Sequence, residues 1–186
     1  MKKLTIDLLK KEFKNFRFEQ NSYINTYPEF IKYFDNIKLI DKHNLIVSSH
    51  FVYGWMPTII SLNLNNLSEV LKILNKVKKG DILKPNELNV LKIAVNNSLV
   101  GVSKLLHFIR PDIYPIWDSK IYKHITGNKS TYGIGKPERY LLYLNEIQIL
   151  VKSNEFQKIY LQLKTYYNYD ITKIRAVDLL LFQSKN

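Results

Sequence analysis

The chain of 186 residues contains no cysteine. Without cysteine there can be no disulfide bonds, thiolate zinc sites, iron–sulfur clusters or cysteine nucleophiles. The sequence also has no internal repeat, no low-complexity tract and no linker long enough to separate two domains. One hydrophobic core suffices for a chain of this length, so we expect a single domain over residues 1–186.

Long apolar runs and acidic residues are scarce. No stretch approaches the ~18 consecutive apolar residues of a membrane-spanning helix, and the basic start lacks the apolar segment of a secretory signal. Lys and Arg number 28 against 16 Asp and Glu, a net charge of +12. This excess favours nucleic acid or an anionic membrane surface as partner, although the bias toward Lys, Asn, Ile and Tyr is also typical of AT-rich genomes. We expect a cytoplasmic monomer without a membrane segment.

Apolar residues recur at helical spacing over most of the sequence, which predicts an all-α protein. The stretch from Lys38 to Val47 is also compatible with a strand. Pro85 suits the first turn of a helix, and the glycine at position 127 suits the end of another. The predicted helices are Thr5–Phe16, Pro28–Phe34, Leu45–Tyr53, Leu67–Lys78, Pro85–Asn96, Val100–Ile109, Trp117–Ile125, Lys136–Val151, Glu155–Tyr166 and Ile171–Phe182.

The segment from Leu99 to Thr126, LVGVSKLLHFIRPDIYPIWDSKIYKHIT, is the most informative part of the sequence. It is expected to form a helix, a proline-bounded turn and a second helix, with Asp118 at the start of the second. A carboxylate in that position accepts hydrogen bonds from free backbone N–H groups and interacts favourably with the helix dipole. The simplest role of Asp118 is therefore that of an N-cap.

Around this aspartate, YPIWDSKIYKHI resembles the P-[IV]-x-D-x-x-[VI]-x-[RK] signature of the helix-hairpin-helix DNA glycosylase superfamily, particularly its adenine and 8-oxoguanine branches. Pro115, Ile116, Asp118, Ile121 and Lys123 fill the pattern. The resemblance implies a helical fold with an active-site cleft between two lobes, no cofactor, and double-stranded DNA with a flipped base as partner. It assigns the catalytic carboxylate to Asp118, which would stabilise the sugar cation that forms as the glycosidic bond breaks.

Upstream, VGVSKLLHF resembles the hairpin and following helix of the same superfamily, most closely the archaeal-type 8-oxoguanine glycosylases. Bifunctional members carry a lysine here that attacks the sugar and forms a Schiff base, and Lys104 matches it. Apolar neighbours would favour its neutral, nucleophilic form. Two alternatives remain open: Lys92, because the lysine of eukaryotic-type relatives lies further upstream, and a merely solvated Lys104.

The hairpin of the superfamily reads close to L-P-G-[VI]-G, where glycines let backbone N–H groups approach a DNA phosphate. Only Gly101 remains here, so Ser98, with Asn96 or Asn97, is expected to contribute to the phosphate contact. The remaining candidates for phosphate contacts are Lys120, Lys123, Lys129, Lys136 and Arg139. The competing interpretation is that these residues form a solvated basic face without a ligand.

A flipped base needs aromatic walls for stacking and polar groups for its edge. The stretch HFVYGWMPT and the residue before Asp118 supply four candidates, although core packing is the commoner fate of Tyr and Trp. These candidates are His50, Tyr53, Trp55 and Trp117. The four histidines lack metal-ligand spacing, and we expect no metal. The C-terminal DITKIRAVDLLLFQ is expected to close the core without a chemical role.

Three functions therefore compete. The leading hypothesis is a DNA glycosylase that excises a damaged or modified base, with AP-lyase activity if a lysine is the nucleophile. Removal of modified bases from invading phage DNA would make it a defence enzyme. The alternatives are a non-catalytic DNA-binding module on the same scaffold, and an RNA-directed toxin or abortive-infection factor.

Overall fold

A computed structural model describes residues 4–19, 21–55 and 59–183. Within these ranges the chain forms ten α-helices and one isolated antiparallel bridge, Leu62 to Val95, so the predicted all-α class is confirmed. No helix among the described residues is both long and apolar enough to cross a membrane. The helices are α1 (Ile6–Asn15), α2 (Ser22–Asp35), α3 (Lys42–Trp55), α4 (Leu67–Lys79), α5 (Pro85–Ala94), α6 (Leu99–Ile109), α7 (Ser119–Thr126), α8 (Pro137–Leu150), α9 (Asn154–Lys164) and α10 (Lys173–Gln183).

Each predicted helix has an observed counterpart, and two N-terminal boundaries differ from expectation by three residues or more. Helix α2 begins six residues before Pro28, because the Asn21 side chain caps it by accepting from the N–H of Ile24 at 3.1 Å. The proline lies inside the helix, where its missing N–H leaves one carbonyl without its usual donor. The strand considered for 38–47 is wrong: α3 starts within it, capped by Asp41, which accepts from the N–H of Asn44 at 2.8 Å.

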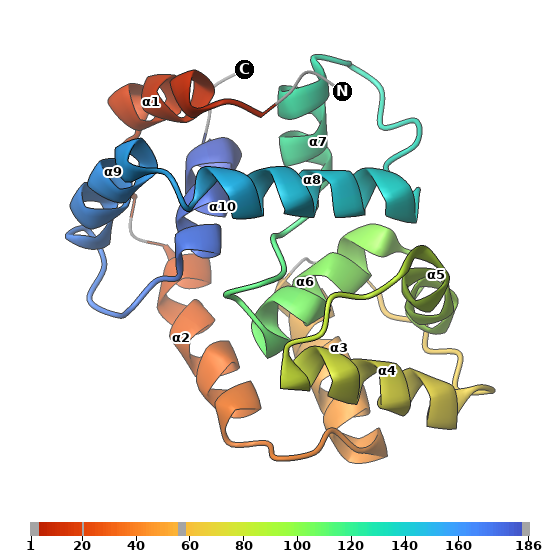
Figure 1. The fold of residues 1–186 in the computed structure, drawn as a ribbon. Helices are drawn as coiled ribbons and strands as arrows, with labels where there is room; N and C mark the ends of the chain where they lie inside the picture. The colour runs from red at the N-terminus through yellow and green to blue at the C-terminus, as the bar shows by residue number, and fades with distance from the viewer. Residues whose placement is uncertain (1–3, 20, 56–58, 184–186) are drawn as a thin grey trace.

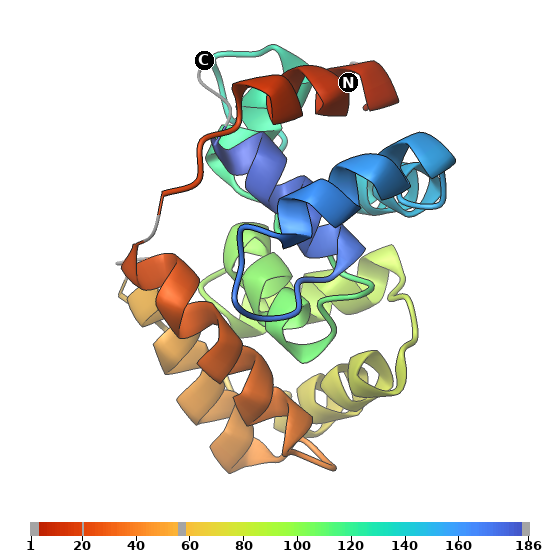
Figure 2. The ribbon, with the colours of Figure 1, turned by 90° about the vertical axis from the view of Figure 1, so that its left-hand side faces the viewer.

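The helices form two lobes (Figures 1 and 2). One lobe contains α2 to α6, and the other combines α1 with α7 to α10, so that the N-terminal helix packs against α9 and α10. Contacts between α5 and α8 join the lobes. Buried side chains from all ten helices form one hydrophobic cluster. The segment before α7 runs between the lobes and brings α6, α7 and α10 near one another (Figure 1).

The hairpin between α5 and α6 is built around two asparagines. Asn96 and Asn97 both have left-handed backbone conformations, with φ of 53° and 50°. Asparagine tolerates this region better than other residues with a Cβ atom. The Asn96 side chain also donates to the carbonyl of Ile59 at 2.8 Å and accepts from the N–H of Ser61. Through these two hydrogen bonds, Asn96 connects the segment before α4 to the hairpin.

Gly101 is a packing residue in this structure. It lies in the first turn of α6, where its N–H donates to the capping hydroxyl of Ser98 at 3.2 Å. A Cβ atom at Gly101 would lie 2.7 Å from Cζ and 2.9 Å from Cε2 of Tyr53. The absence of a side chain at position 101 lets the Tyr53 ring of α3 pack directly against α6.

Gly101→Ala is expected to lower the free energy of unfolding by about 1–3 kcal/mol, because the added methyl group overpacks the contact with Tyr53. Urea denaturation measures the change. Gly54→Ala is the matched control: Gly54 lies in α3 with open space around its Cβ position, so alanine there is expected to be neutral or stabilising. Equal stability of the wild type and Gly101→Ala would contradict the account of this contact.

Candidate active site

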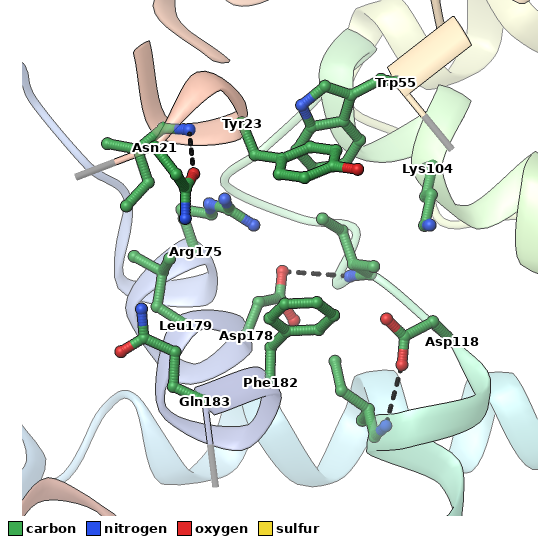
Figure 3. Close-up of a pocket in the computed structure, with 13 residues that line it drawn as sticks. Asn21, Tyr23, Trp55, Lys104, Asp118, Arg175, Asp178, Leu179, Phe182 and Gln183 are labelled. Carbon is green, nitrogen blue, oxygen red and sulfur yellow. Dashed lines mark hydrogen bonds between the residues drawn. The ribbon is translucent and has the colours of Figure 1, made fainter. Parts of the chain in front are cut away.

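A pocket of about 220 Å³ lies between the two lobes (Figure 3). Its lining comes from the start of α2, the end of α3, α6, the start of α7, and α10. An engineered cavity of ~150 Å³ is known to accept benzene, so this pocket has room for a planar ring. It contains four charged side chains, which are Lys104, Asp118, Arg175 and Asp178.

Asp118 caps a helix and lines the pocket at the same time. Its Oδ1 accepts a hydrogen bond of 2.8 Å from the N–H of Ile121, as the N-cap interpretation predicts. Its other oxygen makes no hydrogen bond with the described residues, and the carboxyl group faces the pocket (Figure 3). Asp118 is only 8% exposed. The capping bond thus fixes the orientation of the carboxylate and leaves one oxygen free.

Lys104 reaches the same side of the pocket from α6. Figure 3 shows its ammonium group directed toward the side on which Asp118 lies. The Nζ atom is 5.7 Å from the centroid of the Trp55 ring and makes no hydrogen bond or ion pair with the described residues. Burial lowers the pKa of Lys104, and the charge of Arg175 adds to this effect, whereas the charge of Asp118 opposes it. Lys104 is therefore not the solvated lysine of the simpler interpretation.

Lys92 does not line the pocket. Its Nζ atom lies 3.4 Å from the carbonyl oxygen of Gly135, in the loop before α8. Of the two candidate nucleophiles, Lys104 is the one that the structure brings together with Asp118.

Arg175 and Asp178 are pocket residues that the sequence interpretation missed. Helix α10 does close the core, as expected from Ile174 and Val177, but it also presents these two charged side chains to the pocket. They are 6% and 1% exposed. The available signal was that both charges lie within the otherwise apolar run from Ile174 to Leu181, since a charge expected to be buried marks a candidate functional site.

Arg175 and Asp178 both have polar atoms without hydrogen-bond partners. The Arg175 guanidinium lies over Tyr27, with Cζ 4.4 Å from the ring centroid, and its buried Nε has no hydrogen-bond partner. In Asp178, Oδ2 accepts from the N–H of Ile116 at 3.0 Å, whereas the buried Oδ1 has no partner. Burial raises the pKa of Asp178 well above its usual range, against the opposing effect of Arg175.

A buried chain of hydrogen bonds fixes Tyr27, the residue whose ring lies against the Arg175 guanidinium. His107 donates from Nδ1 to the carbonyl of Tyr114 at 2.7 Å and accepts at Nε2 from the hydroxyl of Tyr27 at 2.9 Å, a tautomer assigned from the network. The Tyr27 ring, in turn, carries the guanidinium. Burial, with the nearby charge of Arg175, lowers the pKa of His107 to about 3.

His107 is therefore expected to make the protein acid-sensitive. Its pKa is about 6.5 in the unfolded chain and about 3 in the folded state, so between these values only the unfolded chain takes up the proton. The contribution of His107 to the free energy of unfolding is fully present above pH 6.5. It falls as the pH drops toward 3, by up to about 1.4 kcal/mol per pH unit.

NMR titration of the histidine rings and unfolding at several pH values measure this effect. His107 is expected to stay neutral to about pH 3. His107→Gln should flatten the pH dependence, whereas His50→Gln should retain it. Protonation of His107 above pH 5 in the folded protein would contradict the assignment.

Of the predicted base-contacting residues, Trp55 lines the pocket and three others do not. Tyr53 packs against α6, and Trp117 is fully buried, donating from Nε1 to the carbonyl of Ile134 at 2.8 Å. His50 is exposed, and its Nδ1 donates within α3 to the carbonyl of Ile46 at 2.7 Å. The turn expected at residues 56–57 falls outside the described residues.

Two aromatic residues at the pocket were not anticipated. Tyr23 meets Trp55 edge to face, with ring centroids 5.6 Å apart and an interplanar angle of 76°. Phe182 projects from α10, and Figure 3 shows it in the pocket together with this pair. Tyr23 and Phe182 are 46% and 50% exposed. The pocket therefore combines accessible aromatic surfaces with charged groups.

Among the basic residues expected to contact DNA, Lys120 lies beside the pocket, with Nζ 4.9 Å from the Phe182 centroid. Arg139 instead donates to the hydroxyl of Tyr122 and, at 3.1 Å, to the carbonyl of Tyr132, and so it holds the loop before α8. Lys136 lies over the Tyr132 ring at 5.9 Å.

Lys129 is exposed in the loop after α7, whereas Lys123 is half-buried. The side chain of Ser98 is occupied in capping α6, and Gly101 is buried beneath Tyr53. No group of three His, Asp or Glu side chains that could hold a metal ion occurs in the part of the chain that the structure describes.

Comparisons of the chain with protein-family models, with curated proteins and with solved structures found no match.

Proposed function

We propose that the protein is a DNA glycosylase that excises a damaged or modified base. The observation that carries this proposal is the meeting of Asp118 and Lys104 in one pocket. These two residues, 14 positions apart in the sequence, are those that the resemblance to helix-hairpin-helix glycosylases singles out. The position of the pocket between two helical lobes is the arrangement expected of that superfamily.

In the proposed reaction, the extruded base enters among the aromatic side chains, and its sugar lies beside Asp118 and Lys104. The bond between C1′ and the base breaks, and the base leaves with the electron pair and is protonated. The free oxygen of Asp118 stabilises the positive charge that develops on the sugar, since a fixed charge in a partly dry site acts strongly. Asp118 is already oriented for this role by its bond to Ile121.

The lowered pKa of Lys104 gives this lysine a role as nucleophile. A neutral amine attacks C1′, so that a carbon–nitrogen bond to the enzyme replaces the one to the base. Loss of the amine proton and opening of the sugar ring give a Schiff base, from which strand cleavage by elimination follows. Where water attacks in place of Lys104, the same carboxylate accepts the proton of the water, and the enzyme is monofunctional.

The charge of the protein supports a DNA partner. The net charge of +12 attracts the phosphate backbone, and Lys120 lies next to the accessible Phe182 at the pocket. Extrusion of a base into this site would bring the flanking phosphates toward Lys120. The pocket would then carry the chemistry, whereas surface lysines supply affinity that does not depend on base sequence.

Incubation with duplexes that each carry one normal, oxidised, alkylated or phage-type modified base tests the proposal. Free base is detected by mass spectrometry, and abasic sites are detected by alkaline cleavage. Release of at least one modified base by the wild type is the expected result, and release of a phage-type base would support a defence role. Absence of release from every duplex would contradict the glycosylase proposal.

One observation favours a second function, a DNA-binding module without catalysis. Asp118 is engaged in the structural hydrogen bond to Ile121, which an inactive descendant of the scaffold would retain for stability. This alternative predicts tight, salt-sensitive binding of duplex DNA with no release of any base. Preference for RNA over duplex DNA in the same binding assay would point instead to an RNA-directed factor.

A further inference from the structure

Arg175 is a buried charged group of the pocket that lacks hydrogen-bond partners. Its side chain is 6% exposed, its Nε is buried without a partner, and its guanidinium makes no hydrogen bond or ion pair with the described residues. A buried charge left without partners is costly to the folded state. Figure 3 shows the guanidinium reaching from α10 toward the middle of the pocket. Its retention there is explained if a ligand supplies the missing partner.

The guanidinium is also held in place before any ligand arrives. Tyr27 supports it at 4.4 Å and Trp55 lies 5.9 Å from it, both distances measured from Cζ to the ring centroid. The hydroxyl of Tyr27 is fixed by the fully buried His107. A preorganised donor loses little conformational freedom on binding, so the orientation of Arg175 can select among ligands.

The chemistry of this group restricts what it can bind. Arginine has only N–H donors and stays protonated, so the ligand atom that faces it must be an acceptor. The pocket also contains the carboxylate of Asp118, which disfavours a phosphate or other anion and favours a neutral acceptor. The aromatic side chains around the pocket suit a planar ring. A ring carbonyl oxygen satisfies all of these conditions.

We propose that Arg175 reads a ring carbonyl oxygen of the extruded base, so that the pocket selects keto bases over amino bases. This inference rests on the proposed function, since it takes the ligand to be a nucleobase. An exocyclic amino group in the same position would place its N–H donors against the N–H donors of the guanidinium. Asp178 Oδ1, one helical turn away and without a partner, is the next polar contact. A carboxyl group can donate or accept there, so Arg175 sets the preference.

Free bases test this without any turnover. Hypoxanthine against adenine, and uracil against cytosine, are pairs of equal ring size. The members of each pair differ at one position, C6 of the purine or C4 of the pyrimidine, which carries a carbonyl or an amino group, and in the proton on the adjacent ring nitrogen. Binding is measured by quenching of tryptophan fluorescence, because Trp55 lines the pocket, and by NMR shifts. The keto member of each pair is expected to bind roughly 10- to 100-fold more tightly. Arg175→Met should abolish this ratio, whereas Arg175→Lys, which keeps a donor, should retain part of it.

Equal affinities within each pair, an unchanged ratio in Arg175→Met, or no binding of any base would each overturn the inference. The ratio is informative even if a substitution weakens the fold, because overall loss of stability affects both members of a pair alike. Keto preference without base release from duplex DNA would contradict the glycosylase proposal alone. Base release without keto preference would contradict the role of Arg175 alone.

Discussion

Asp118→Asn is expected to reduce base release at least ~100-fold while leaving the protein folded. Asparagine is as good an N-cap as aspartate, so the bond to the N–H of Ile121 is retained. The negative charge that stabilises the sugar cation is lost, and removal of such a preorganised group typically costs two to three orders of magnitude in rate. Single-turnover release from the best duplex of the panel measures the effect.

Asp41→Asn is the matched control for this substitution. Asp41 caps α3 with a bond of the same kind, 2.8 Å to the N–H of Asn44, but it lies outside the pocket. Both variants should unfold at nearly the wild-type urea concentration, and only Asp118→Asn should lose activity. Full base release by Asp118→Asn would restrict Asp118 to capping and would remove it from the mechanism.

The second large effect concerns covalent capture. Borohydride reduces a Schiff base to a stable amine, so the wild type is expected to become cross-linked to a duplex that it processes. Lys104→Gln should abolish the cross-link. Lys92→Gln is the matched control, because Lys92 contacts the Gly135 carbonyl outside the pocket and should leave capture intact.

The rate of capture should also depend on pH in a defined direction. Only the neutral amine attacks, and the pKa of Lys104 lies below its usual value of 10.5. The rate is therefore expected to rise with pH and to level off. It should level off at a lower pH than it would if the nucleophile were an exposed lysine. Capture that persists in Lys104→Gln and disappears in Lys92→Gln would reassign the nucleophile.

The helical class was predictable from the sequence for physical reasons, whereas the pairing of Asp118 with Lys104 was expected only from the resemblance to helix-hairpin-helix glycosylases. Apolar periodicity reports helices directly, and the capping preference of Asp118 locates the start of α7 to within two residues. Start positions were less predictable, since the cap of α2 at Asn21 outweighs the signal of Pro28.

The remaining walls of the pocket could not be predicted in this way. Tyr23 and Phe182 are more than 150 positions apart and line the same pocket only because α10 lies across this pocket from the start of α2. Tyr53 and Trp55 are two positions apart in the same stretch of sequence, yet Tyr53 packs against α6 and Trp55 lines the pocket. Helix phase and lobe packing decide such differences, and neither is encoded in a local pattern.

If the protein is a DNA glycosylase, the pocket between its lobes receives a nucleotide extruded from duplex DNA. The most direct test is a crystal structure with a duplex that carries a tetrahydrofuran analogue of an abasic site, which requires no knowledge of the target base. The account predicts that the tetrahydrofuran ring lies between the Asp118 carboxylate and Lys104 Nζ, with the phosphates near Lys120. DNA bound on another face, with this pocket empty, would contradict it.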